Sequence, residues 1–209
     1  MKKLNEIIDC DLDTLIYGIS DDSRDISEGY LFVATRGFNV DHFDYIDKAI
    51  ENGAAAVICD REIDFDIPHV VVEKDINKLY PELCRNFYGV DTDNLSLIGI
   101  TGTDGKTTSA TIVQKILNDS INCAYIGTNG LFVNGETHHI SNTTPCISEL
   151  YSCLSTIQDN SCQSVVMEVS SEALLHERTQ GLKFSIVAIT NITEDHLNRH
   201  HTMEAYMEA

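Results

Sequence analysis

Residues 95–117, LSLIGITGTDGKTTSATIVQKIL, contain the pattern that decides the fold. The apolar run Leu95–Thr101 predicts a buried β-strand, and Lys106–Leu117 has the apolar spacing of an amphipathic helix. A turn with two glycines joins them. A strand, a glycine turn and a helix in this order are typical of a parallel sheet flanked by helices. The apolar residues expected on one face of the helix are Ala110, Val113, Ile116 and Leu117.

The turn, Gly102-Thr103-Asp104-Gly105-Lys106-Thr107-Thr108, has the composition of a loop that holds the phosphates of a nucleoside triphosphate. Backbone N–H groups and the positive end of the following helix bind phosphate oxygens in such loops. Lys106 adds a positive charge, and the Thr107 hydroxyl can bind Mg²⁺. The common loop has a glycine where this chain has Ile100, so this loop is a shorter variant. We predict that all seven residues bind nucleotide and that Lys106 is catalytic; the alternative is a tight turn without a ligand.

Further motifs lie on both sides of this loop. They are Asp22-Ser23-Arg24, Gly29–Ala34, Asn142-Thr143-Thr144-Pro145, Met167–Ser171 with Arg178, and Thr190–Leu197. In this order they resemble the Mur ligase family, and most closely its members that add the third amino acid to the peptidoglycan precursor. The resemblance extends over nearly the whole chain.

The resemblance implies an ATP-dependent ligase that uses ATP and Mg²⁺ as cofactors. Its partners would be UDP-MurNAc-L-Ala-D-Glu and a diamino acid, joined through an acyl phosphate. A related ligase that adds D-Ala-D-Ala shares the loop and the metal motifs and is one alternative. A protein that binds nucleotide or UDP-sugar peptide without catalysis is another.

Glu168 ends an apolar run, where a carboxylate is costly unless a cation accompanies it. Mg²⁺ is the cation that we expect. The resemblance implies that Thr107, Glu168 and His196 hold the metal ions. The alternatives are a strand end or helix cap for Glu168 and a solvated helix start for His196. A zinc site on His196 and His200 has no cysteine or glutamate pair at a familiar spacing to support it.

The Asp22-Ser23-Arg24 motif offers a hydroxyl and a guanidinium suited to a uracil edge or a diphosphate. The resemblance implies that Ser23 binds the UDP part. Asn191 follows the last predicted strand and joins the nucleotide-binding set, because ligands of parallel sheets bind at the carboxyl ends of strands. The other residues that the resemblance assigns to substrate are Asn142, Thr143, Thr144, Ser170, His176 and Arg178. His176 departs from the family, which often has glutamine there, and the alternative for Arg178 is a surface salt bridge.

The pattern predicts an α/β fold with two domains, residues 1–90 for the UDP-substrate and an incomplete parallel-sheet P-loop ATPase domain at 95–209. The polar stretch 88–94 separates them. The expected N-terminal strands are Leu31–Ala34, Ala55–Cys59 and Val70–Val72, with helices at Phe43–Asn52 and Asp75–Phe87. Later strands are expected at Val165–Val169 and Phe184–Thr190, and His138-His139 reads as a solvated hairpin.

The formal net charge of −19 argues against a nucleic-acid partner or an anionic membrane surface. The seven cysteines include no CxxC pair, which favours reduced thiols. No stretch approaches the length of a membrane span, so we expect a cytoplasmic protein, and we take it as a monomer.

No lysine follows Lys183, whereas the family has a carbamylated lysine shortly after the His196 motif and then a third, ligase domain. We therefore expect a partial ligase in which the C-terminal ligase domain is absent. Apolar surface that the rest of the sheet would normally cover is expected to be exposed, and ligation by this chain alone is not expected.

Overall fold

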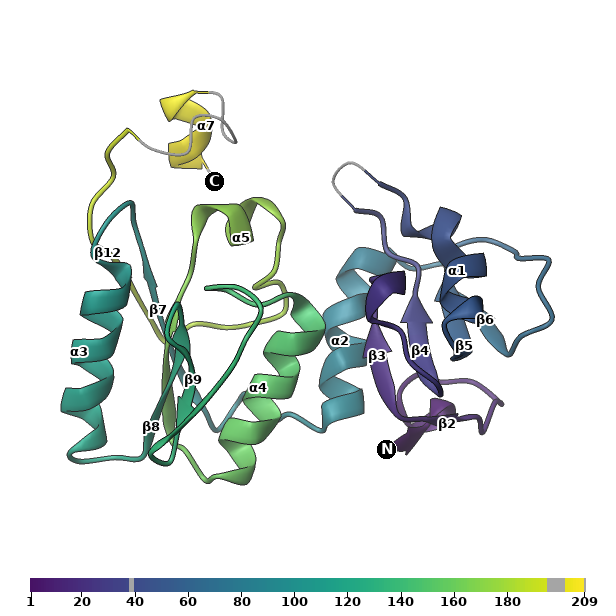
Figure 1. The fold of residues 1–209 in the computed structure, drawn as a ribbon, viewed down its shortest axis with the longest axis horizontal. Helices are drawn as coiled ribbons and strands as arrows, with labels where there is room; N and C mark the ends of the chain where they lie inside the picture. The colour runs from purple at the N-terminus through teal and green to yellow at the C-terminus, as the bar shows by residue number, and fades with distance from the viewer. Residues whose placement is uncertain (38–39, 195–201, 209) are drawn as a thin grey trace. The chain divides into compact units, whose positions relative to one another are not determined.

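The computed structural model describes residues 1–37, 40–194 and 202–208. The chain divides into two compact units, Met1–Gly89 and Val90–Ala209, each with its own sheet (Figure 1). Both units mix helices with parallel strands, so the predicted α/β class is correct. Within the described ranges, no helix has the length and apolar character needed to cross a bilayer.

Unit 1 contains a four-stranded parallel sheet in the order β3-β4-β5-β6. Its strands are Gly18–Ser20, Tyr30–Val33, Ala54–Cys59 and His69–Val71. The helices of the unit are η1 (Leu4–Glu6), η2 (Ser23–Asp25), η3 (His42–Tyr45), α1 (Ile46–Glu51) and α2 (Ile76–Tyr88). A short pair, β1 (Lys2–Lys3) and β2 (Leu15–Ile16), completes it. The helix predicted at 43–52 is thus two elements, because its first turn is a 3₁₀ turn.

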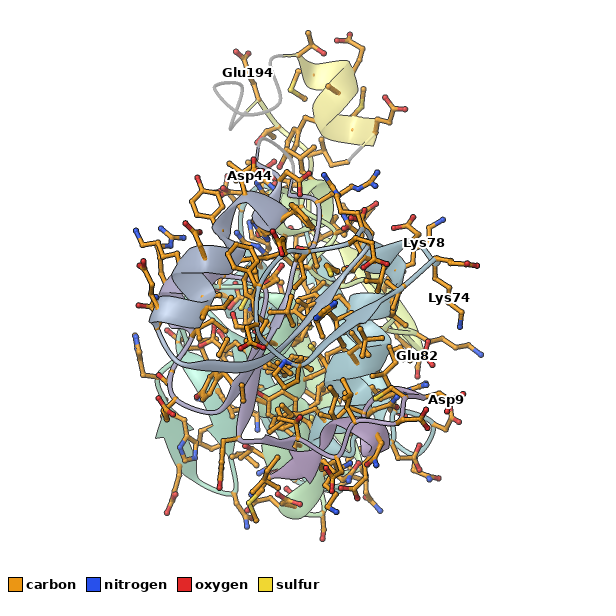
Figure 2. The ribbon with its side chains drawn as sticks, turned by 90° about the vertical axis from the view of Figure 1, so that its right-hand side faces the viewer. Asp9, Asp44, Lys74, Lys78, Glu82 and Glu194 are labelled. Carbon is orange, nitrogen blue, oxygen red and sulfur yellow. The ribbon has the colours of Figure 1, made fainter. Side chains whose placement is uncertain are left out.

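Helix α2 shows why the local sequence folds as it does. Asp75 caps its N-terminus by accepting a hydrogen bond from the Asn77 N–H at 3.1 Å. Gly89 ends it in the left-handed conformation, with φ +69°. Its apolar face is buried, whereas Lys78 and Glu82 point outward from the side of the unit seen in Figure 2. Helix α2 is therefore amphipathic: its apolar face packs into the core of unit 1, and its polar face is exposed to solvent.

Unit 2 contains a six-stranded sheet in the order β10-β9-β8-β11-β7-β12. Strands β8, β11, β7 and β12 run parallel, and β9 and β10 add an antiparallel hairpin. The strands are β7 (Ser96–Thr101), β8 (Cys123–Gly127), β9 (Gly130–Val133), β10 (Glu136–His138), β11 (Ser164–Glu168) and β12 (Ile186–Ile189). The helices are α3 (Lys106–Asn118), α4 (Ile147–Asp159), α5 (Ser171–Leu175) and α7 (Met203–Glu208).

Helices α3 and α4 lie on opposite sides of this sheet (Figure 1). The buried face of α3 differs from the prediction at one position. Ile116 is 64% exposed, whereas Gln114 is buried and donates from Nε2 to the Cys123 carbonyl at 2.8 Å. With 3.6 residues per turn, Ala110, Gln114 and Leu117 share a face, and Ile116 points away from it. The prediction for Ile116 was therefore wrong.

Strand β12 exposes the apolar surface that was expected. Ile186, Val187 and Ile189 are 59%, 71% and 63% exposed. The strand pairs with β7 and forms one edge of the sheet. The hairpin predicted around His138 is also present, as β9 and β10. All seven cysteines are free thiols.

Candidate functional site

The glycine loop between β7 and α3 needs both of its glycines. Gly105 is the N-cap of α3 with φ +79°, and Gly102 has φ +133°. A Cβ on Gly102 would also collide with Thr190 and Asn191. The two glycines therefore allow the tight turn that joins β7 to α3 and places the N-terminus of α3 at the loop.

Lys106 is the first residue of α3 and folds back over the loop. Its Nζ donates to the carbonyl oxygens of Gly102 and Thr103, at 2.6 and 2.7 Å. None of the ion pairs in the described part of the chain involves this lysine. Its positive charge is therefore held at the loop by two backbone carbonyl oxygens and not by an ion pair with a carboxylate of the described residues.

Asn191 holds the loop from the neighbouring strand end. Its Oδ1 accepts from the Asp104 N–H, and its Nδ2 donates to the Asp104 carbonyl, both at 3.1 Å. The Thr190 hydroxyl donates to the same carbonyl at 2.6 Å. Thr103 shares a 3.0 Å hydrogen bond with the Tyr206 hydroxyl. These contacts fix the shape of the loop, so Asn191 supports the residues predicted to bind nucleotide and does not itself line the cavity beside them.

Glu168 ends β11 with its side chain completely buried. Its Oε2 accepts from the hydroxyls of Thr107, at 2.8 Å, and Thr128, at 3.3 Å. Its Oε1 accepts from the Thr128 N–H, at 3.0 Å, and from the Tyr125 hydroxyl. Burial, helped by the neighbouring carboxylate, raises the pKa of Tyr125 well above its usual value, so the phenol stays protonated as a donor.

These residues suit a divalent cation. A buried carboxylate without a cation is costly, and no described Lys, Arg or His side chain forms an ion pair with Glu168. The carboxylate of Glu168 and the hydroxyl of Thr107 are the oxygen donors that Mg²⁺ prefers. His196, the third predicted ligand, lies outside the described residues, as does His200. In the described ranges, no cluster of three or more His, Cys, Asp or Glu side chains is arranged for a metal.

A cavity of about 430 Å³ opens beside the loop and Glu168. Eleven of the predicted site residues line it: Thr103, Asp104, Gly105, Lys106, Thr107, Asn142, Thr143, Thr144, Glu168, Ser170 and Arg178. Gly102 and Asn191 do not line the cavity, Thr108 and His176 are exposed outside it, and Ser23 belongs to unit 1.

Thr144 connects the polar wall of this cavity. It is fully buried, donates to the Glu168 carbonyl and accepts from the Ser170 N–H, both at 3.0 Å. Its own carbonyl accepts from Nη1 of Arg178 at 3.1 Å. Ser170 in turn caps α5 by accepting from the Ala173 N–H at 3.2 Å. The buried hydroxyl of Thr144 thus orders the wall, and Arg178 is held to the same residue while lining the cavity.

Sequence reasoning missed the contribution of β8. Thr128 lines the cavity, and Tyr125 contacts Glu168 from within that strand. The apolar run Cys123–Gly127 could have been recognised as a strand, which would have placed Thr128 at its carboxyl end. Ser171 and Glu172 also line the cavity, because they follow Ser170 into α5.

Ser23 is buried at the carboxyl end of β3, in the turn η2. Arg24 does not turn toward it but pairs with Asp22, whose Oδ1 accepts from Nε at 2.9 Å. Beside them, the Thr35 hydroxyl donates to Asp21 at 2.9 Å. The carboxyl ends of the unit 1 strands thus carry a second polar cluster.

Asp21 and Asp22 predict opposite effects of pH on stability. Loss of hydration raises the pKa of Asp21, although His42 and the Thr35 hydroxyl oppose the shift. The folded state then binds this proton more tightly than the unfolded state, so Asp21 makes the protein less stable as pH rises above 3.8 toward the raised pKa. The hydrogen bond from Arg24 lowers the pKa of Asp22, so its stabilisation is present above 3.8 and is lost as pH falls through the lowered value.

Urea unfolding followed by circular dichroism, from about pH 3 to pH 7, tests both signs. The difference in unfolding free energy between variant and parent chain should shift in favour of Asp21→Asn as pH rises. For Asp22→Asn, the same difference should shift against the variant as pH rises. The same direction in both variants would contradict the assignment.

A parallel sheet with a glycine loop leading from a strand into a helix, and a buried carboxylate at the next strand end, defines the class of phosphate-loop α/β proteins. Comparison with known proteins narrows this class. The model of the Mur ligase middle domain matches residues 100–209, and that of the Mur ligase family catalytic domain matches residues 15–92. The chain belongs to the Mur ligase family, whose members are ATP-dependent ligases.

Individual relatives agree with this assignment. The chain is 40% identical over 195 residues to the UDP-N-acetylmuramoyl-L-alanyl-D-glutamate–2,6-diaminopimelate ligase of Bacillus velezensis, covering 93% of this chain and 40% of that one. The ligase of the same name from Chlorobaculum tepidum is 41% identical over 198 residues, covering 93% and 39%. The chain thus spans about two fifths of the length of these curated relatives.

Solved structures show the same fold. A UDP-N-acetylmuramoyl-L-alanyl-D-glutamate–2,6-diaminopimelate ligase superposes with a TM-score of 0.74 at 27% identity, covering all of this chain and 44% of that one. The MurF ligase of Thermotoga maritima superposes with a TM-score of 0.56 at 24% identity, covering 94% and 42%, which shows the fold alone.

Proposed function

We propose that this chain is the part of a Mur ligase that binds ATP and the UDP-linked substrate, and that the whole enzyme adds 2,6-diaminopimelate to UDP-MurNAc-L-Ala-D-Glu. The observation that carries the proposal is that Lys106, Glu168 and Arg178 line one and the same cavity. Its lining includes the glycine loop and also hydroxyl, amide and guanidinium groups from other segments of unit 2. A phosphate donor and an acidic acceptor can therefore meet in one place.

The nucleotide is held by the loop. Backbone N–H groups at the start of α3 and the Lys106 ammonium face the phosphates, and Thr107 and Glu168 hold the Mg²⁺ that neutralises phosphate charge when it is bound. Thr103, Gly105 and the remaining loop residues shape this wall. The chain provides position and charge, and no protein nucleophile is required.

The acceptor is held opposite. Asn142, Thr143 and Ser170 offer hydrogen bonds to the peptide part, and the Arg178 guanidinium pairs with a carboxylate. Ser23, in unit 1, binds the UDP part. The acceptor carboxylate takes the γ-phosphoryl group of ATP and releases ADP. The amine of the diamino acid then attacks the acyl phosphate, phosphate leaves and an amide remains.

We assign 2,6-diaminopimelate as the third amino acid because the names of the relatives specify it. The ligase that adds D-Ala-D-Ala is the second candidate, because the MurF structures share the fold. The first is favoured because the curated relatives at about 40% identity are diaminopimelate ligases, and because the solved diaminopimelate ligase superposes with a TM-score of 0.74, against 0.56 for the MurF of Thermotoga maritima. We place the enzyme in the cytoplasm, acting on soluble precursors as a monomer.

Arg178 gives a test of the acceptor side. Arg178→Ala should weaken binding of UDP-MurNAc-L-Ala-D-Glu by about 10- to 100-fold, because a charge-assisted hydrogen bond contributes about 1.5–3 kcal/mol. Isothermal titration calorimetry measures this affinity. ATP affinity should change little in the same variant.

Arg85→Ala, on the exposed surface of α2, is the matched control and should bind substrate like the parent chain. Equal affinity in Arg178→Ala and the parent chain would contradict the assignment of Arg178. Tighter binding of UDP-MurNAc-tripeptide than of the dipeptide substrate would instead favour the D-Ala-D-Ala-adding ligase.

A further inference from the structure

The two oxygens of Glu168 have different surroundings. Oε2 accepts hydrogen bonds from the hydroxyls of Thr107 and Thr128, which both line the cavity. Oε1 accepts from the Thr128 N–H at 3.0 Å and from the Tyr125 hydroxyl. Tyr125 does not line the cavity. One oxygen therefore faces groups at the binding site, and the other is held from inside the sheet.

We propose that Tyr125 is a positioning residue that holds Oε1 of Glu168, so that Oε2 is the oxygen presented to the divalent cation. The proposal rests on the proposed function, in which Glu168 is a ligand of Mg²⁺. The Thr107 and Thr128 hydroxyls now donate their protons to Oε2. When a cation binds Oε2, each hydroxyl can turn its proton away, because it rotates about a single bond. The Tyr125 hydroxyl and the Thr128 N–H remain on Oε1.

The ring of Tyr125 is fixed, which a positioning residue requires. It is 3% exposed and packs in a core cluster with Ile98, Ile100 and Val166. It also stands directly opposite Val166 in the register between β8 and β11, two residues before Glu168. The hydroxyl therefore reaches the carboxylate from a neighbouring strand whose position is set by the sheet.

Gly127 provides an independent observation. A Cβ at this position would overlap Oε1 of Glu168 and lie 2.5 Å from the Tyr125 hydroxyl oxygen. No positive φ is recorded for this residue, so the reason for glycine here is space rather than backbone conformation. The missing side chain of Gly127 thus leaves the space in which the Tyr125 hydroxyl meets Oε1 of Glu168.

A positioning residue is needed because the carboxylate of a glutamate rotates easily about its terminal bond. Its terminal torsion has a broad, roughly two-fold profile, so a single donor on Oε1 leaves several orientations accessible. Restricting the carboxylate to one of these orientations when the cation binds would cost conformational entropy and so weaken binding. Groups that orient metal ligands typically contribute 10- to 100-fold in metal affinity.

The test is the affinity of the 209-residue chain for Mn²⁺ in the presence of ATP, with Mn²⁺ replacing Mg²⁺ so that electron paramagnetic resonance reports the free ion. Tyr125→Phe should weaken Mn²⁺ binding about 10- to 100-fold. Tyr151→Phe removes the hydroxyl of another buried tyrosine, on α4 and outside the cavity, and should leave the affinity unchanged.

A double-mutant cycle separates positioning from a general structural effect. In the Glu168→Gln background, Tyr125→Phe should produce no further loss of Mn²⁺ affinity, because the carboxylate that it positions is gone. Equal losses in both backgrounds, or an unchanged affinity in Tyr125→Phe beside a large loss in Glu168→Gln, would overturn the role of Tyr125 and leave the proposed function intact. Unchanged affinity in Glu168→Gln itself would overturn both.

Discussion

Lys106→Met is expected to weaken ATP binding by about 10- to 100-fold, because charge-assisted hydrogen bonds to phosphate contribute about 1.5–3 kcal/mol. The lysine stands at the first position of α3, beside the loop backbone that it contacts through Gly102 and Thr103. Methionine keeps the length and apolar body of the side chain but removes the charge. Calorimetric titration with ATP and Mg²⁺ measures the change in Kd.

The matched control is Lys115→Met, which removes an exposed lysine from the last turn of the same helix. It should bind ATP like the parent chain. If both variants lose affinity equally, the effect comes from net charge rather than from a phosphate contact. If neither loses affinity, the loop is a turn without a nucleotide.

Thr144→Val is expected to lower the free energy of unfolding by about 2–5 kcal/mol. Valine has a similar shape but no hydroxyl, so the Ser170 N–H loses its acceptor and the Glu168 carbonyl loses a donor. Each buried polar group left without a partner costs about 1–3 kcal/mol. Urea unfolding followed by circular dichroism measures the change, since the chain contains no tryptophan for fluorescence.

Thr143→Val is the neighbouring control. The Thr143 hydroxyl shares one 3.1 Å hydrogen bond with Thr128 at the solvent-accessible surface, so its loss should cost less than about 1 kcal/mol. A stable Thr144→Val variant with weakened binding of the UDP-linked dipeptide would mean that Thr144 contacts substrate. An unstable variant supports its role in ordering the cavity wall.

The fold was largely readable from local sequence. The loop from Gly102 to Thr108, the strand before it and the helix after it are set by glycine positions and apolar spacing within about twenty residues. The same reasoning predicted five helices or strands of unit 1 to within a few residues. It missed β3 and β8, because short apolar runs do not distinguish strands from other buried segments.

The candidate site was readable only in part. Sequence singled out Lys106, Thr107 and Glu168, which the structure brings to one cavity, because a lysine after a glycine turn and a carboxylate ending an apolar run are both unusual without a ligand. It did not identify which residues touch. Tyr125 looks like an ordinary core tyrosine until the register of β8 against β11 brings its hydroxyl to Glu168.

The sequence by itself determined the family, the order of the motifs and the chemical types at the site, because each motif is a short stretch of neighbouring residues and the motifs follow in a fixed order along the chain. Only the tertiary structure decided that Asn191 holds the loop and that Thr144 is buried in the cavity wall. It also decided that the oxygens of Glu168 have separate partners. Such roles depend on strand register and side-chain packing between distant segments, and a one-residue shift in register would change them all.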